Sequence, residues 1–175
     1  MAQARNWARV LGRVCRHRWL DESDLHKAIP PEMLQRLTAR VAASEKRHSG
    51  EIRIFVEAGL PVSYLLRDAT PRERAVAMFG KLRVWDTDHN NGVLVYLLLA
   101  ERAMEIVADR GLSRRVDAGE WQRIVGRMGD AFKQGRIEDG LTQALEEVSA
   151  LLVAHFPLAP GEPDRNELPD EPVLG

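Results

Sequence analysis

The chain has 175 residues, an apolar fraction of 45% and a net charge of −1, which suit one globular domain with tails. The nearly neutral charge argues against a nucleic-acid-binding protein, and no apolar run reaches the length of a membrane span. Cys15 is the single cysteine, so no intrachain disulfide forms, as is typical of a reducing compartment. No stretch resembles a signal peptide, and we therefore expect a cytoplasmic protein.

Charge is spread unevenly along the chain. Residues 1–20 contain five arginines and no acidic residue, whereas residues 157–175 contain five acidic residues and one arginine. Either each end binds an oppositely charged partner, or the two ends pair with each other. We divide the chain into a basic helix with its linker over 1–30, a folded domain over 31–156, and an acidic, Pro-rich tail over 157–175 that is predicted to be disordered.

The N-terminal segment is predicted to form a basic amphipathic helix over residues 5–20, because its arginines recur at three- and four-residue steps. One interpretation is a helix that lies peripherally on the cytoplasmic face of the inner membrane and meets anionic lipid. The other is a helix docked on its own domain with its arginines in water. The residues expected to face a membrane are Arg5, Trp7, Arg9, Arg13, Arg16 and Trp19.

Three elements follow the linker. Pro31 opens a helix that runs to about residue 48. Residues 51–58 alternate polar and apolar side chains and are predicted to form the first strand. Thr70, followed three residues later by Glu73, predicts the capped start of a further helix.

The middle of the chain is predicted to be a β-hairpin. Residues 93–99 are continuously apolar, too short for a membrane span and too rich in β-formers for a surface helix. A short break at 100–102 favours antiparallel pairing with the strand that follows. Because a hairpin returns the chain to the end where it began, we expect the polar loop 86–91 to meet the loop 108–112.

Two helices complete the domain. Ser113 or Asp117 caps the first, and the second covers residues 137–156. Apolar strands flanked by amphipathic helices indicate the α/β class. We predict a three-layer α/β/α sandwich with a small mixed sheet that contains a central β-hairpin.

Three stretches of the chain, HSGEIRIFVEA, NNGVLVYLLLAERAMEIVADRGL and FKQGRIEDGLTQAL, resemble the TPM domain family over about residues 32–154. The family is named for thylakoid-lumen, photosystem-repair and worm receptor-modulator proteins. The resemblance implies an α/β/α sandwich, acid phosphatase activity in some members, a divalent metal such as calcium near these loops in others, and roles in the assembly or repair of membrane complexes in others. Asp109 and Arg110 stand where the family commonly has smaller or neutral residues.

The two loops carry candidate metal ligands, and no organic cofactor is expected. Carboxylate and amide oxygens at close spacing suit Ca²⁺ or Mg²⁺, although turn chemistry also explains these residue types. The candidate ligands are Asp86, Asp88, Asn90, Asn91 and Asp109.

The same loops carry basic residues that we expect to face an anion: Arg110, Arg114 and His89. Together with Asp88 or Asp109, and with Arg115 as a further cation, they include the residue types that metal-assisted phosphoryl chemistry needs. The alternative is that the arginines are solvated or paired with acids. No Cys-x5-Arg loop or P-loop is present, so enzymatic activity is left open.

Three functions therefore follow from the sequence. The first is a TPM-type binding module that acts at the cytoplasmic membrane face on a membrane-protein complex, with a divalent ion between loops 86–91 and 108–112. The second is a metal-assisted acid phosphatase that hydrolyses phosphomonoesters. The third is a metal-free cytosolic interaction domain.

Overall fold

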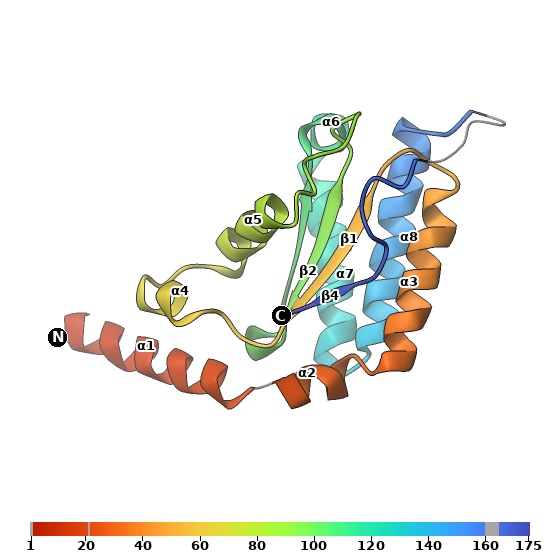
Figure 1. The fold of residues 1–175 in the computed structure, drawn as a ribbon. Coiled ribbons are helices and arrows are strands. Elements are labelled where there is room, and N and C mark those ends of the chain that lie inside the picture. The colour runs from red at the N-terminus through yellow and green to blue at the C-terminus, as the bar shows by residue number, and fades with distance from the viewer. Residues whose placement is uncertain (1, 21, 160–164) are drawn as a thin grey trace.

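A mixed sheet between two layers of helices forms the structure (Figure 1). This computed structural model describes residues 2–20, 22–159 and 165–175, and only the backbone of residues 2–9 and 22. Within these residues there are eight α-helices, one short 3-10 helix and four strands. The predicted α/β sandwich is confirmed.

The sheet has the strand order β3-β2-β1-β4. β2 runs parallel to β1 and antiparallel to β3, and β4 runs parallel to β1. The predicted hairpin is therefore present, and it turns through η1 (Leu99–Glu101) to Arg102, whose φ of 48° is left-handed. The strands are β1 (Ile52–Glu57), β2 (Val93–Leu98), β3 (Ala103–Ala108) and β4 (Val173–Leu174).

Helices cover both faces of the sheet (Figure 1). One layer consists of α3 (Pro31–Glu45), α7 (Ala118–Lys133) and α8 (Ile137–His155). The other consists of α5 (Pro71–Lys81), α4 (Val62–Leu66) and α1 (Ala2–Trp19), and α2 (Glu22–Ala28) connects the two layers.

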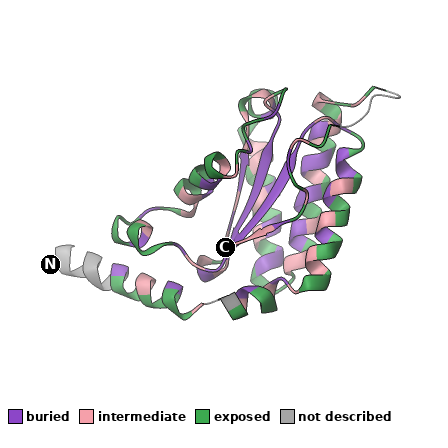
Figure 2. Cartoon of the chain, in the orientation of Figure 1, coloured by how far each residue is buried: buried purple, intermediate pink, exposed green. Residues whose placement is uncertain are grey.

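Each face of the sheet builds its own core because alternate strand residues point to opposite sides. Ile54 of β1 belongs to the core under α3, α7 and α8, whereas its neighbour Phe55 belongs to the core under α5. All six residues of β1 are buried (Figure 2), although their alternation suggests a half-exposed strand. The polar members are buried because they have partners; for example, both oxygens of Glu57 accept hydrogen bonds from Arg74.

Local sequence signals place the helix starts correctly. Thr70 and Glu73 form a reciprocal capping box at α5, in which each side chain accepts from the other residue's backbone N–H. Of the two candidates for the cap of α7, Asp117 is the one that accepts from the backbone, from Gly119 N–H at 2.8 Å. α2 and α4 are short helices that the sequence pattern does not predict.

The loop expected at 108–112 contains a helical turn. α6 (Arg110–Ser113) begins directly after β3, and the Asp109 side chain accepts from Arg110 N–H at 2.6 Å. An Asp–Arg–Gly sequence suggests a loop, but Asp109 acts as an N-cap. The chain therefore leaves the sheet as a helix at this rim.

The prediction of disorder is wrong for the described end of the tail. Val173–Leu174 add strand β4 to the edge of β1, and the Glu51 carboxylate accepts the N–H groups of Glu167 and Leu168 at 3.0 and 3.2 Å. Low apolar content predicts disorder because such a segment buries too little surface. Here backbone hydrogen bonds to a sheet edge hold the segment instead.

α1 is docked on its own domain. Arg13 donates to Glu101 Oε1 at 2.5 Å and to Ala69 O at 2.6 Å, so its side chain faces the domain rather than a membrane. His17 is buried; its Nδ1 accepts from Leu60 N–H and its Nε2 contacts Glu101 Oε1, both at 2.9 Å. Although burial raises the pKa of the Glu101 carboxyl, the hydrogen bonds from Arg13 and His17 lower it below its ordinary value.

Two large apolar side chains of α1 are exposed to solvent. Trp19 is 85% exposed and Leu11 is 60% exposed, and Arg16 is exposed beside them. No helix in the described part of the chain is long and apolar enough to cross a membrane. The side chains of Arg5, Trp7 and Arg9 lie outside the described residues.

Candidate functional site

The hairpin brings the two predicted loops together at one rim of the sheet. Gly111 N–H donates to Asn90 O at 2.8 Å, and Arg110 Nε donates to Asn90 Oδ1 at 3.0 Å. Asp109 N–H donates to Gly92 O at 2.9 Å, which extends the β2–β3 pairing by one residue pair. Residues 86–91 and 108–112 therefore form a single surface.

Glycine is required where the loops touch. A Cβ atom at Gly111 would lie 2.4 Å from Asn90 O and 2.6 Å from His89 O, closer than real Cβ contacts allow. Asn90 has a φ of 52°, in the left-handed region that asparagine tolerates better than most residues. The close approach at this rim thus depends on both residue types.

A basic hollow of about 290 Å³ opens between the loops. The three residues that the sequence assigns to an anion, His89, Arg110 and Arg114, all line it. The remaining lining residues are Asn90, Gly111 and Arg115. Arg115 is fixed there because its Nη1 donates to His155 O at 2.8 Å and its guanidinium lies 4.5 Å from the centre of the Phe156 ring.

The hollow is cationic. In the part of the chain that the structure describes, no acidic side chain forms an ion pair with Arg110, Arg114 or Arg115, although arginine pairs are common elsewhere on the surface, as between Arg36 and Glu138. Clustered cations without acidic partners raise the local concentration of anions. The arrangement therefore suits an anionic group such as a phosphate or a carboxylate.

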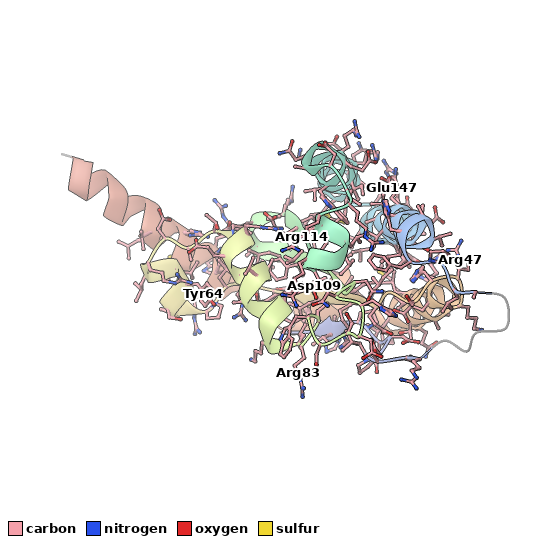
Figure 3. All side chains as sticks on the ribbon, turned by 90° about the horizontal axis from the view of Figure 1, so that it is seen from above. Arg47, Tyr64, Arg83, Asp109, Arg114 and Glu147 are labelled. Atoms are coloured by element: carbon pink, nitrogen blue, oxygen red, sulfur yellow. The ribbon has the colours of Figure 1, made fainter. Side chains whose placement is uncertain are left out.

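Two of the predicted metal ligands, Asp86 and Asp88, have arginine neighbours outside the basic hollow. Asp86 forms an ion pair with Arg83, which projects outward, whereas Asp109 and Arg114 lie beside α6 (Figure 3). The side chain of Asp88 is 67% exposed and lies 3.8 Å from Arg165. In the described chain, no ion pair or hydrogen bond links the carboxylate of Asp86 or Asp88 to Asp109.

The other candidates also diverge. Asn90 Oδ1 already accepts from Arg110, and Asn91 is anchored away from it, because its Nδ2 donates to Ser49 O at 3.0 Å in the turn before β1. Asn91 Oδ1 and Asp109 Oδ2 are buried without a described hydrogen-bond partner. Asp109 pairs with Gly92 and so lies on the α5 face, whereas Asn91 reaches toward the opposite layer.

The predicted donor set therefore does not converge on one cation position. Calcium takes six to eight oxygens, and these side chains supply one unpaired buried oxygen on each side of the strand. Among the described residues there is no group of three or more His, Cys, Asp or Glu side chains placed to hold a metal ion. The guanidinium of Arg110, next to Asp109, supplies the positive charge at this rim.

A buried polar network links α5 to the sheet. No local sequence pattern predicts this network. Tyr96 is fully buried and its hydroxyl donates to Glu57 Oε2 at 2.8 Å, while Arg74 from α5 donates to both oxygens of the same carboxylate. Burial and the Glu57 charge raise the pKa of Tyr96. Only the register that places Glu57 near Tyr96 across the β1–β2 pair reveals this network.

Comparison with known proteins gives a family model and two solved structures. The model, described as TPM domain, matches residues 23–151. The NMR structure of BA42 from the psychrophilic bacterium Bizionia argentinensis is 26% identical, with a TM-score of 0.73, and the match covers 84% of this chain and 95% of that one. The N-terminal domain of a protein from P. gingivalis is 20% identical over 74% of this chain and 82% of that one, and its TM-score of 0.58 indicates a shared fold. No curated protein matches the chain.

Proposed function

Because the chain belongs to the TPM domain family, we propose that it is a binding module that recognises an anionic group at the rim of its sheet. The observation that carries the proposal is the hollow in which His89, Arg110 and Arg114 meet. His89 comes from the loop 86–91, and Arg110 and Arg114 come from α6 and its C-terminal end, so the contact between Gly111 and Asn90 holds them together before any ligand arrives. Guanidinium groups suit phosphate and carboxylate oxygens because their N–H donors bind both oxygens at once.

Calorimetry with inorganic phosphate as the probe tests this proposal. Arg114→Gln removes a charge that has no described acidic partner, and we expect it to weaken the phosphate affinity by about fivefold or more. Arg123→Gln is the matched control, because Arg123 is an exposed arginine of α7 outside the hollow. Equal affinities of the wild type and Arg114→Gln would refute the proposal.

We further propose that α1 places this module at the cytoplasmic face of a membrane, where it acts on a protein complex. Leu11 and Trp19 lie two turns apart on the exposed side of α1, and exposed arginines flank them. Flotation with vesicles that contain anionic phosphatidylglycerol tests this placement. Trp19→Ser should reduce the bound fraction, whereas Trp85→Ser, at a half-exposed tryptophan of the α5–β2 loop, should not. Absence of the wild type from anionic vesicles would overturn it.

Hydrolysis of a phosphomonoester is the second candidate function. It is favoured by the position of Asp109, whose Oδ2 has no described partner and which directly precedes Arg110 of the basic hollow. Turnover of p-nitrophenyl phosphate that Asp109→Ala abolishes would support this function. Turnover that survives both Asp109→Ala and Asp88→Ala would assign the activity to another site.

Divalent cation binding stays a prediction. Calorimetry with Ca²⁺ and Mg²⁺ tests it separately from phosphate binding, because the divergent oxygens described above would have to rearrange around the ion. A metal-dependent increase in melting temperature that Asp109→Asn removes would support a cation site at this rim.

A further inference from the structure

The free edge of the sheet is a second surface, and the groove beside it shares no lining residue with the basic hollow. β3 is the outer strand on one side, and no other strand of the described chain pairs with its far edge. Because Asp109 N–H bonds Gly92 O directly opposite, Val107, Glu105 and Ala103 direct their backbone groups toward β2. The intervening residues, Met104, Ile106 and Ala108, therefore direct their N–H and C=O groups outward.

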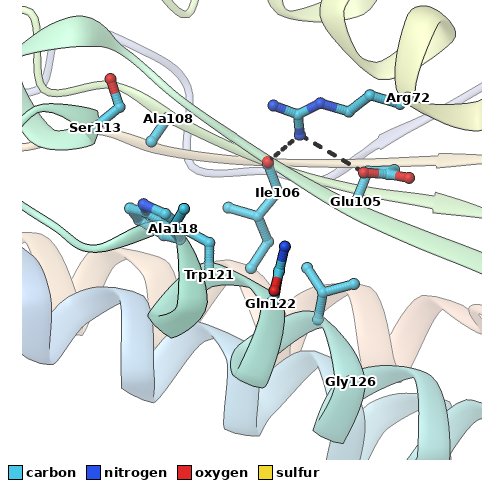
Figure 4. Close-up of a pocket in the computed structure, with 10 residues that line it drawn as sticks. Arg72, Glu105, Ile106, Ala108, Ser113, Ala118, Trp121, Gln122 and Gly126 are labelled. Carbon is cyan, nitrogen blue, oxygen red and sulfur yellow. Dashed lines mark hydrogen bonds and ion pairs between the residues drawn. The ribbon is translucent and has the colours of Figure 1, made fainter.

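An apolar groove of about 540 Å³ runs beside this edge, between the start of α5 and the first turns of α7 (Figure 4). Ile106, Trp121 and Val125 give it apolar walls. The indole N–H of Trp121 is buried without an acceptor in the described structure. The groove thus joins an unpaired strand edge to an apolar surface.

Arg72 covers the edge from α5. Its guanidinium donates to Ile106 O and lies 3.6 Å from Glu105 Oε2 (Figure 4). A cation over a free edge hinders unspecific strand pairing. The side chain of Arg72 is 52% exposed, so it can leave Ile106 O for a carboxylate carried by an incoming chain.

The opposite edge of the same sheet is already occupied by a segment of this kind. There β4 adds to β1, and the acidic residues Asp170 and Glu171 precede it, separated from it by Pro172. Arg53 Nη1 donates to Glu171 O at 3.2 Å, so an arginine of the sheet contacts the docked acidic segment. An extended chain with carboxylates followed by a short apolar run is therefore a ligand that this sheet accepts.

We propose that the free edge of β3 binds an extended, acidic segment of a partner protein. The segment pairs with the outward backbone groups of β3 and places an apolar side chain in the groove against α7. One of its carboxylates forms an ion pair with Arg72. Main-chain pairing supplies the affinity in such strand addition, and the groove supplies the selectivity. Because Arg72 has to leave Ile106 O before a strand can pair there, a carboxylate on the incoming segment is the acceptor that suits it.

The probe for this proposal is an acetylated peptide with the sequence of residues 166–175, added to the intact ¹⁵N-labelled protein. The chain's own tail already pairs with Phe55 and Val56 of β1, whereas no strand of the described chain pairs with the outer edge of β3. We expect the Trp121 indole and Ala108 amide signals to move together and the Ala108 amide to gain protection from hydrogen exchange. Shifts confined to β1 and β4, which would mean exchange with the tail, or no shifts at millimolar peptide, would overturn the proposal.

Two glycines of α7 provide a matched pair of variants. Gly126 lines the groove and Gly129 does not, and a Cβ atom at either meets no atom within 4 Å. Gly126→Leu should fill the groove and weaken peptide binding at least about tenfold, whereas Gly129→Leu should leave it unchanged. Arg72→Gln should weaken binding by a similar factor and reduce its salt dependence. Equal affinity of Gly126→Leu and Gly129→Leu would refute the docking site.

Discussion

Acidification should destabilise the protein through His48, the buried histidine of the turn between α3 and β1. His48 is fully buried; its Nδ1 lies 3.0 Å from Gly50 O and its Nε2 lies 2.9 Å from Ser44 Oγ. Burial lowers the pKa of His48 to about 4, although the hydrogen bond to Gly50 opposes the shift. The ring is therefore neutral in the folded protein at neutral pH.

The size and sign follow from linkage. In the unfolded chain the pKa of His48 is about 6.5, so between pH 6.5 and 4 the unfolded chain binds a proton that the folded protein does not. The contribution of His48 is fully present above pH 6.5 and is lost as the pH falls toward 4. The difference between the two pKa values corresponds to about 3 kcal/mol in the free energy of unfolding.

Urea unfolding at pH 7.5, 6.5, 5.5 and 4.5 measures this effect. We compare the wild type with His48→Asn, because the pKa of buried His17 is also lowered by burial and its contribution cancels in the difference. The advantage of the wild type over the variant should shrink by about 1.4 kcal/mol per pH unit below pH 6.5. A difference that does not change with pH would refute the reasoning.

Three further substitutions test the packing that positions the rim. Thr70→Ala removes the cap of α5 and should lower the melting temperature by about 2–4 °C in a calorimetric scan. Tyr96→Phe removes the hydroxyl bonded to Glu57 and should cost about 1–3 kcal/mol in urea unfolding. Gly111→Ala places a Cβ atom against Asn90 O, so it should lower both the melting temperature and the affinity for phosphate.

Each of these expectations has a clear opposite. An unchanged melting temperature of Thr70→Ala would mean that the capping box does not stabilise α5 measurably. Tyr96→Phe as stable as the wild type would mean that Arg74 alone satisfies Glu57. Phosphate affinity that survives Gly111→Ala would separate the hollow from the contact between the two loops.

The elements that the sequence predicts correctly carry their signal locally. The apolar run of β2 and the short break after it indicate a hairpin without reference to the rest of the chain. The same holds for Thr70 and Glu73, which are three residues apart and close the capping box between themselves. Because the sequence predicts the hairpin, it also predicts that His89 lies near Arg110 and Arg114, and these three residues line one hollow.

The features that the sequence does not predict depend on contacts between distant residues. β4 has two residues, and its partner in β1 lies more than a hundred residues earlier, so no hydropathy pattern predicts this strand. Arg13 reaches Glu101 across 88 residues, which turns its side chain from the expected membrane face to the domain. The directions of the rim carboxylates are likewise set by individual partners, such as Arg83 for Asp86.

Anion recognition at the rim is tested most directly by titrating the ¹⁵N-labelled protein with inorganic phosphate and following the Gly111 amide and the Arg114 Nε–H. Both residues line the basic hollow: Gly111 lies at the close backbone contact with Asn90, and Arg114 carries one of its positive charges. We predict that both signals move along one saturable curve with a common Kd, and that Arg114→Gln weakens that curve. Signals of the hollow that stay in place while other regions respond would contradict an anion site at this rim.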